Sequence, residues 1–399
     1  GRCELLNDTL PAGETLRIAP MTFGFYCGDF DDLGNTITDY IYQYKWDYTR
    51  DTYFNRTSLS IWRAAPLTDK VFQMIEAARY IGYERLWVDD FWFDAKGNWN
   101  GIFGDDWREI NAYLRRQGML FRLWMPPWHA DRLSKVWVEH PEWMLDFHGN
   151  WYNWTIDMSQ EDAYQWVLNM LCEKQKEFGT YDLRVDGDPC NLKNNRSFMT
   201  QGEGGWNCTL KQSEQFYRLY REFKERNPEA GLDGCSSGGH TLGIEPGRYT
   251  DQQQITDGMC MHMGGYYTTM LLPIDKHQGM PIARKGEGMD WQRHTDADLN
   301  LFSAPLHGMQ DPEDGVAPEA LEGYRKDLEL FYFLRRQGVY GRYIKVFRPT
   351  MEHGDKTFLL QRMTRDLEKG LLMISSNRLN PLLGMLCASG IYWAGEAIF

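Results

Sequence analysis

The sequence predicts a (β/α)8 TIM barrel flanked by β segments. Two observations predict it. Short apolar runs alternate with amphipathic helical stretches from residue 58 onward, and about eight such strand–helix units follow one another. A doubly wound open sheet is the alternative. No GxGxxG or GxxxxGK[ST] motif follows a predicted strand, so the barrel is the better prediction.

The chain divides into three predicted parts: residues 1–57, the tail of an N-terminal β domain with a linker; residues 58–340, the catalytic barrel; and residues 341–399, a small C-terminal β segment. In the first part, Leu10–Leu16 predicts a turn between strands and Thr36–Tyr48 predicts a helix. The final residues, Ser389–Phe399, match no defined pattern.

The elements of the predicted barrel come from apolar periodicity. The predicted strands are Ser58–Trp62, Arg85–Asp90, Met119–Met125, Tyr181–Asp186, Gly231–Cys235, Gln252–Asp257, Thr269–Pro273 and Leu301–Pro305. The predicted helices are Thr68–Tyr80, Trp107–Arg116, Ser159–Glu177, Ser213–Arg226 and Leu321–Gln337. Two further strands, Thr357–Met363 and Leu371–Ser375, are predicted after the barrel.

Charge and hydropathy exclude several partner classes. The formal net charge of −13 argues against a nucleic-acid or anionic-membrane surface, because both need clustered positive charge. No run of 18 apolar residues predicts a membrane span. The first residues, Gly1-Arg2-Cys3, do not resemble a signal peptide and look cut, since no Met precedes them. A cytoplasmic or a secreted bacterial location stays open, as does a homo-oligomer.

Aromatic residues make up 15% of the chain, with 16 Trp. Sugar-binding clefts use Trp and Tyr in this way, because a flat ring covers the C–H face of a pyranose while the indole N–H donates a hydrogen bond. Aromatic packing in the core is the other interpretation, and composition does not separate the two.

The eight Cys residues contain no CxxC pair, so they are expected to be free thiols, with a Cys190–Cys208 bridge left open. A metal-dependent barrel hydrolase is a less favoured hypothesis. His129, His140 and His240 lack metal-ligand spacing, as does His262. We therefore expect no metal and no cofactor.

Acidic residues end several predicted strands. Asp89 and Asp90 follow one strand, Asp186 and Asp257 end two others, and Asp233 lies at the tip of a fourth. A single Asp after a strand is usually a turn former or helix cap. Several such residues at one barrel mouth, however, provide the paired carboxylates that glycoside hydrolysis requires. The aromatic residues predicted nearby are Trp62, Trp87, Trp92 and Trp124.

Several segments, in order, resemble the melibiase-type glycosidases of glycoside hydrolase family 36. The matching segments are Leu86-Trp87-Val88-Asp89-Asp90, Gly104-Asp105-Asp106-Trp107, Gly118–Pro127, His140-Pro141-Glu142-Trp143, Ile156–Ser159, Asp182-Leu183-Arg184-Val185-Asp186, Gly234–Gly239 and Gln254-Ile255-Thr256-Asp257. The resemblance spans nearly the whole chain.

The resemblance implies a retaining mechanism. Asp186 would be the nucleophile and Asp257 the acid/base, with their carboxyl groups about 5–5.5 Å apart. Arg184, two residues before Asp186 on the same strand face, would favour the ionised nucleophile; a buried ion-pair role for it is compatible.

The resemblance also implies the sugar contacts. Asp89 and Asp90 would bind the axial 4-hydroxyl and the 6-hydroxyl, which selects the galacto configuration. Trp124 would form a pocket wall, or instead pack inside the barrel. Cys235 would line the pocket, or instead be a small buried apolar residue. Trp62 and Asp233 complete the predicted substrate-binding set.

Some positions depart from the family pattern. Phe91 replaces a glycine after the aspartate pair, and His240-Thr241 replaces an arginine, for which Arg248 is the nearest candidate. Arg184 replaces a lysine. These changes alter the predicted pocket near the sugar's 2- and 6-positions.

The leading hypothesis is therefore an exo-acting α-galactosidase-type hydrolase that removes terminal α-linked galactose from oligosaccharides or glycoconjugates. An α-N-acetylgalactosaminidase or α-galactosaminidase of the same family is the alternative. A non-catalytic galactoside-binding barrel is the alternative from another class.

Overall fold

The structure is a computed structural model. It describes residues 12–13, 15, 21–46, 56–61, 68–90, 92–101, 107–146, 154–187, 205–255, 266–278, 306–309, 318–349, 357–376, 392–393 and 396–397, and the statements below concern these residues.

Eight parallel strands form the central sheet of the described chain, in the order β10-β1-β2-β3-β6-β7-β8-β9. They are β1 (Ser58–Ile61), β2 (Arg85–Val88), β3 (Leu120–Met125), β6 (Asp182–Val185), β7 (Leu232–Gly234), β8 (Gln252–Gln254), β9 (His277–Gln278) and β10 (Leu306–Met309). The last strand pairs with the first, and the others follow in chain order. The predicted (β/α)8 barrel with flanking β segments is confirmed.

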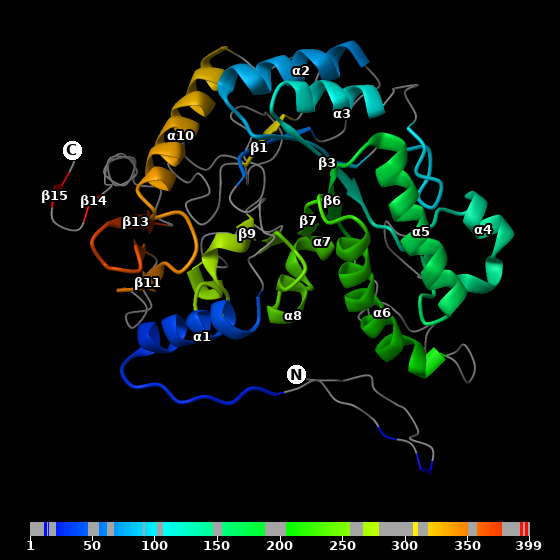
Figure 1. Cartoon of the computed structure of the whole chain (residues 1–399), viewed down its shortest axis with the longest axis horizontal. Helices are drawn as coiled ribbons and strands as arrows, with labels where there is room; N and C mark the ends of the chain where they lie inside the picture. Colours follow the sequence, from blue (N-terminus) through cyan, green and yellow to red (C-terminus); the bar gives the residue numbers. More distant parts are fainter. Residues whose placement is uncertain are drawn as a thin grey trace.

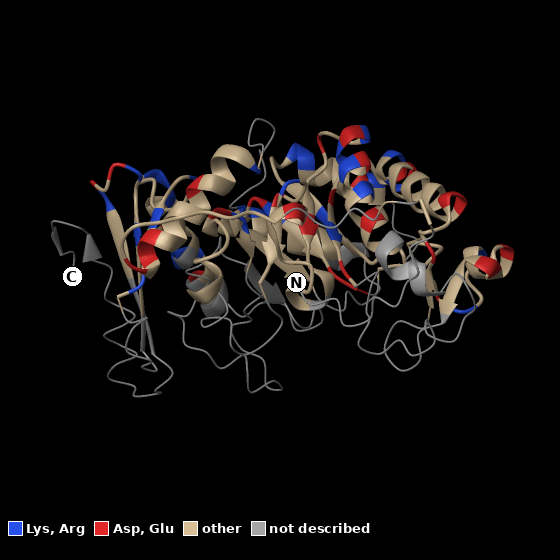
Figure 2. Cartoon of the chain, turned by 90° about the horizontal axis from the view of Figure 1, so that it is seen from below, with Lys and Arg blue, Asp and Glu red and all other residues tan. Residues whose placement is uncertain are grey.

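Helices surround these strands (Figure 1). They are α2 (Thr68–Ile81), α3 (Trp107–Arg116), α5 (Glu161–Phe178), α6 (Gly205–Arg226), α7 (Ser236–Gly239), α8 (Ile244–Gly247) and α10 (Pro318–Arg336). Acidic and basic side chains are intermixed over the described helices (Figure 2), so the net negative charge is not gathered on one of them.

The strand sequences explain which side chains face the helices. Side chains alternate between the two faces of a strand. In β3 the apolar Phe121 and Leu123 belong to the main hydrophobic core, in which helix residues such as Ile110 and Leu114 of α3 also lie. Arg122, between them, instead donates hydrogen bonds to side chains of β7, β8 and β9 across the barrel. The barrel interior is therefore polar and charged.

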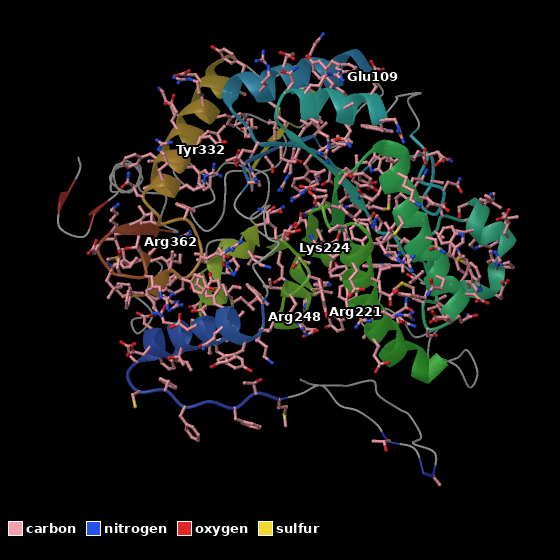
Figure 3. The ribbon with its side chains drawn as sticks, viewed as in Figure 1. Glu109, Arg221, Lys224, Arg248, Tyr332 and Arg362 are labelled. Carbon is pink, nitrogen blue, oxygen red and sulfur yellow. The ribbon has the colours of Figure 1, made fainter. Side chains whose placement is uncertain are left out.

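Side-chain bonds attach the helices to the strands and to each other. On α10, Tyr332 donates to the carbonyl of Gly82 at 2.6 Å, and Arg335 pairs with Glu84 at 3.0 Å, so the last barrel helix is held against the end of α2. On α6, Lys224 pairs with Asp251 at 3.1 Å, just before β8. Figure 3 labels Tyr332 and Lys224.

An excursion that the sequence did not predict separates β3 from α5. It contains α4 (Lys135–Glu139), the 3-10 helix η1 (Pro141–Trp143), and a hairpin of β4 (Met144–Asp146) and β5 (Trp154–Ile156). The amide of Ile156 donates to the carbonyl of Trp128 at 2.7 Å, which brings the hairpin back to the end of β3.

The C-terminal segment is an antiparallel sheet of β11 (Lys345–Phe347), β12 (Thr357–Met363), β13 (Gly370–Ser376), β14 (Tyr392–Trp393) and β15 (Glu396–Ala397). Helix α1 (Phe30–Tyr44) docks on it: Asn35 exchanges two 2.9 Å hydrogen bonds with the backbone of Val346. This helix begins before the predicted Thr36, because Asp29 forms a capping box with Asp32.

One predicted strand is wrong. Thr269–Pro273 belongs to a helical turn, in which Thr269 Oγ1 donates to the carbonyl of Tyr266 and the amide of Leu272 donates to the carbonyl of Thr268. The seventh barrel strand is β9, a few residues later. The predicted strand Leu301–Pro305 lies outside the described residues, and β10 begins at the next residue. In the part of the chain described here, no helix is both long and apolar enough to cross a bilayer.

Candidate active site

The candidate site lies where β2, β3, β6 and β7 end. Asp89 and Asp90 directly follow β2, Trp124 is the last residue but one of β3, and Asp186 directly follows β6. Cys235 directly follows β7. The carboxyl ends of the strands are where barrel active sites form.

Both carboxylate oxygens of Asp186 are held by donors. The indole Nε1 of Trp124 donates to Oδ2 at 2.7 Å, and the amide of Gly187 donates to Oδ1 at 2.7 Å. The side chain remains partly exposed. Trp124 is itself buried and stacks on Phe93, with ring centroids 6.0 Å apart. The carboxylate therefore has a fixed orientation while it stays open to solvent.

Arg184 is the central cation of the site. Its Nη1 donates to Asp233 at 2.6 Å, its Nη2 donates to Gln254, and its guanidinium lies 4.2 Å from the ring centroid of Trp87. Burial would lower its pKa, but Cys235 and the carboxylates of Asp233, Asp89 and Asp186 together raise the pKa above its usual value. Arg184 thus stays charged among several acidic groups.

Asp89 has a strongly perturbed acidity. Burial of its carboxyl raises the pKa to about 7, and the charges of Asp186 and Asp90 add to that effect, whereas Arg184 and the amide of Asp90 oppose it. That amide donates to Asp89 Oδ1 at 2.9 Å. Near neutral pH, Asp89 therefore exchanges between its acid and carboxylate forms.

Asp233 does not lie at the mouth. Its side chain has 0% exposure and its Oδ2 pairs with both Arg122, at 2.9 Å, and Arg184. The sequence placed it at a strand tip, whereas the register pairs Asp233 with Arg184, one layer below Asp186. Its contacts are those of an internal ion-pair partner, and no contact with substrate is proposed for it.

The loop after β7 approaches the end of β8 closely. A Cβ on Gly239 would lie 2.5 Å from the carbonyl oxygen of Ile255 and 2.8 Å from that of Gln254, and its φ is +94°. Only glycine fits there. Ser236 takes a left-handed φ of +47°, next to the buried Cys235. Arg248, by contrast, pairs with Glu245 on the exposed face of α8.

His129 is a feature of the site that the sequence did not single out, since it was weighed only as a metal ligand. It is buried, its Nδ1 lies 3.1 Å from Thr155 Oγ1, and its Nε2 faces the Cα of Gly187, where a Cβ would not fit. Burial lowers its pKa to about 3, so it is neutral at ordinary pH. Its hairpin partner Thr155 comes from the unpredicted excursion.

Other predicted site residues lie outside the described residues. Asp257, the predicted acid/base, and Trp62, a predicted substrate contact, belong to this group. The chain leaves β8 at Gln254, three residues before Asp257. Within the described ranges, no three His, Cys, Asp or Glu side chains gather as a metal site would require.

Comparison with known proteins assigns the chain to a family. The melibiase family model matches residues 38–281, which include β1 to β9 and the site described above. The chain belongs to the melibiase family. Among curated members of similar sequence, the α-galactosidase of Escherichia coli is 26% identical over 196 residues, 44% of this chain and 26% of that protein. α-Galactosidase 1 of Pediococcus pentosaceus is 21% identical over 72% of this chain and 40% of its own length.

Solved structures agree on the fold of this melibiase-family chain. The galactosidase domain of the α-galactosidase–sucrose kinase AgaSK superposes with a TM-score of 0.74 at 16% identity, over 88% of this chain and 50% of that one. The GH36 α-galactosidase AgaA of Geobacillus stearothermophilus gives 0.73 at 15% identity, over 88% and 52%. The chain thus spans about half the length of these solved relatives.

Proposed function

We propose that this chain forms the catalytic barrel of a retaining, exo-acting α-galactosidase. Family membership supports the reaction class. The observation that carries the proposal is the arrangement of Asp186: a partly exposed carboxylate at the barrel mouth, oriented by Trp124 and coupled to the buried cation of Arg184. Such a group is suited to attack a sugar carbon.

In the proposed mechanism, an oxygen of Asp186 bonds to the anomeric carbon as the glycosidic C–O bond breaks, which gives a β-galactosyl-enzyme. Asp257 protonates the departing oxygen, then removes a proton from the water that hydrolyses the intermediate. Because Trp124 and the amide of Gly187 already hold Asp186, little reorganisation is needed when the charge on its oxygens changes.

Asp89 and Asp90 are the proposed ligands of the sugar hydroxyls. A carboxylate accepts two O–H bonds in a fixed plane, and such charge-assisted bonds are about twice as strong as neutral ones. Trp124 would supply the wall. Variants of the relative AgaA have been solved with raffinose and with stachyose, which supports α-galactoside oligosaccharides as the substrate class here.

The test compares Asp186→Asn and Asp257→Asn with wild type on raffinose and on an aryl α-galactoside. We expect Asp186→Asn to lose about 10³-fold or more of kcat on both substrates. Asp257→Asn should lose about 10²–10⁴-fold on raffinose but less on the aryl substrate, whose leaving group needs little protonation. Asp157→Asn, which alters a turn at Ser159, is the matched control and should keep activity.

NMR of the first sugar released completes the test, because a retaining enzyme releases α-galactose. Inversion, or near-full activity of Asp186→Asn, would refute the assigned roles. Aryl galactosaminide, N-acetylgalactosaminide and glucoside substrates test the sugar choice. If wild type binds galactosides with no turnover in prolonged assays, the barrel is a binding protein instead.

A further inference from the structure

Three buried charged side chains are connected inside the barrel, and one of them, Arg184, acts electrostatically on the carboxylate proposed as nucleophile. Arg122 Nη1 donates to Asp233 Oδ2 at 2.9 Å, and Arg184 Nη1 donates to the same oxygen at 2.6 Å. The three side chains are at most 3% exposed. One carboxylate oxygen therefore holds two guanidinium groups together, away from solvent.

Each arginine also donates to glutamine side chains. Arg122 donates to Gln278 at 2.9 Å and to Gln252 at 2.8 Å, while Arg184 donates to Gln254. The guanidinium group presents its donors in a rigid plane, so contacts in two directions restrict its rotation. The carboxamides come from β8 and β9, and they connect those strands to β3 and β6.

The strand register places this network directly beneath the candidate site. Trp124 pairs with Arg184, and Arg184 pairs with Asp233, on three adjacent strands. Arg122 lies two residues before Trp124, and Arg184 lies two residues before Asp186, so each arginine shares the inward face with one member of the Trp124–Asp186 hydrogen bond.

We propose that Arg122 and Asp233 are positioning residues, which touch no sugar but hold the Arg184 guanidinium at a fixed place where one positive charge serves both Asp89 and Asp186. This inference rests on the proposed function. Asp233 pairs with the guanidinium inside the barrel and the Trp87 ring covers its face, so its position is fixed. From that position its charge acts electrostatically on both Asp89 and Asp186.

The test uses Asp233→Asn, with Asp182→Asn as the matched control. Asp182 is also a buried barrel carboxylate, at the start of β6, and is paired with Arg85 at 3.0 Å. Arg85 shares the Gln252 carboxamide with Arg122, so Asp182 lies at the far end of the same network, whereas Asp233 contacts Arg184 itself. Both variants break a buried pair and should lower Tm to a similar extent. Only Asp233→Asn should lower kcat, by about tenfold to a hundredfold, because small displacements of a catalytic group cost that much.

The pH profile separates positioning from simple charge removal. If Arg184 kept its place, loss of the Asp233 charge would favour ionised Asp186 and move the acid limb of kcat/KM to lower pH. If Arg184 is displaced, as we propose, the limb moves to higher pH by about half a unit or more. A limb that moves down or does not move would overturn the inference. Arg122→Lys, which keeps the charge but loses the planar fork, should shift the limb in the same upward direction by less.

A binding measurement tests the inference even if a variant has lost turnover. Arg122→Lys tests it even if Asp233→Asn does not fold. Calorimetry with 1-deoxygalactonojirimycin, a cationic galactose analogue, should show about tenfold weaker binding to Asp233→Asn and Arg122→Lys, but not to Asp182→Asn. If wild type hydrolyses raffinose but Asp233→Asn and Arg122→Lys match Asp182→Asn in kcat and affinity, the positioning role fails and the proposed function stands. If wild type lacks turnover, the proposed function fails and the affinities still decide the positioning role.

Discussion

At the scale of single residues, Asp89 shows how opposing effects act on one carboxyl. Burial raises its pKa to about 7, and the nearby positive charge of Arg184 opposes that rise. The native carboxyl is therefore protonated below pH 7 and ionised above it. Because ionised carboxylates bind hydroxyl groups more strongly than neutral acids do, the charge state of Asp89, as a proposed sugar ligand, should control sugar affinity.

We predict that the Kd for galactose falls about fourfold between pH 6 and pH 8, as Asp89 becomes ionised and its hydrogen bonds gain about 1 kcal/mol. Asp89→Asn should bind more weakly and with little pH dependence over this range. Titration calorimetry at several pH values measures both. An equal pH dependence in Asp89→Asn would show that another group is responsible.

The residues of the site could be predicted from the sequence where they lie at the ends of predicted strands. Asp89, Trp124 and Asp186 were placed at one mouth from periodicity and from the family resemblance, and the described strand ends bring them there. The depth of Asp233 in the barrel could not be predicted. Its strand is only three residues long, so the sequence pattern does not show that Asp233 lies a layer below the mouth. The position of His129 could not be predicted either, because it depends on a contact with Thr155, 26 residues later, on a hairpin that was not predicted.

At the scale of elements, the loop after β7 depends on one glycine. Gly239 has a φ of +94° and lies against the backbone carbonyls of Gln254 and Ile255, which cannot move without distorting the end of β8. We predict that Gly239→Ala lowers the free energy of unfolding by at least about 2 kcal/mol, through strain and overlap together.

Gly243→Ala is the control for this prediction. Gly243 has an extended backbone, and its Cβ would make an ordinary 3.6 Å contact with Pro246. Its stability should change by no more than about 0.5 kcal/mol. Urea denaturation of both variants gives the comparison, and equal losses would refute a specific role for Gly239.

Long amphipathic elements could be predicted well from the sequence, and short ones could not. The helix Trp107–Arg116 was predicted with its observed bounds, because apolar residues recur at helical spacing. The apolar run Thr269–Pro273 was assigned as a strand, but short runs of this kind do not distinguish a strand from a helical turn. The hairpin β4–β5 has strands of three residues, too short to show a period of two.

At the scale of the whole molecule, buried neutral histidines link folding to pH. Burial lowers the pKa of His129 and of His277 to about 3, below the usual 6.5. The unfolded chain binds these protons below about pH 6.5, whereas the native chain does not until about pH 3. Their contribution to stability is thus fully present above pH 6.5 and is lost as the pH falls toward 3.

We predict that the free energy of unfolding falls with acidification from pH 6.5 to 5, by up to about 1.4 kcal/mol per pH unit for each of these histidines. His277→Leu should show a shallower slope by that amount. Ile274→Val, a buried neighbour that does not titrate, should lower stability equally at each pH. Urea denaturation from pH 7.5 to 5 measures the slopes, and identical slopes in wild type and His277→Leu would contradict the prediction.

The ionic interior of the barrel, finally, has a consequence for how this sequence can diverge. Where aliphatic layers fill a barrel, one residue can be exchanged for another of similar volume. Here loss of one partner leaves a desolvated ion, at a cost of about 3–5 kcal/mol, whereas replacing a complete set by hydrocarbon is often neutral for stability. Substitutions at Arg122, Arg184 and Asp233 should therefore be correlated in related sequences, so that a change at one position is accompanied by changes at the other two.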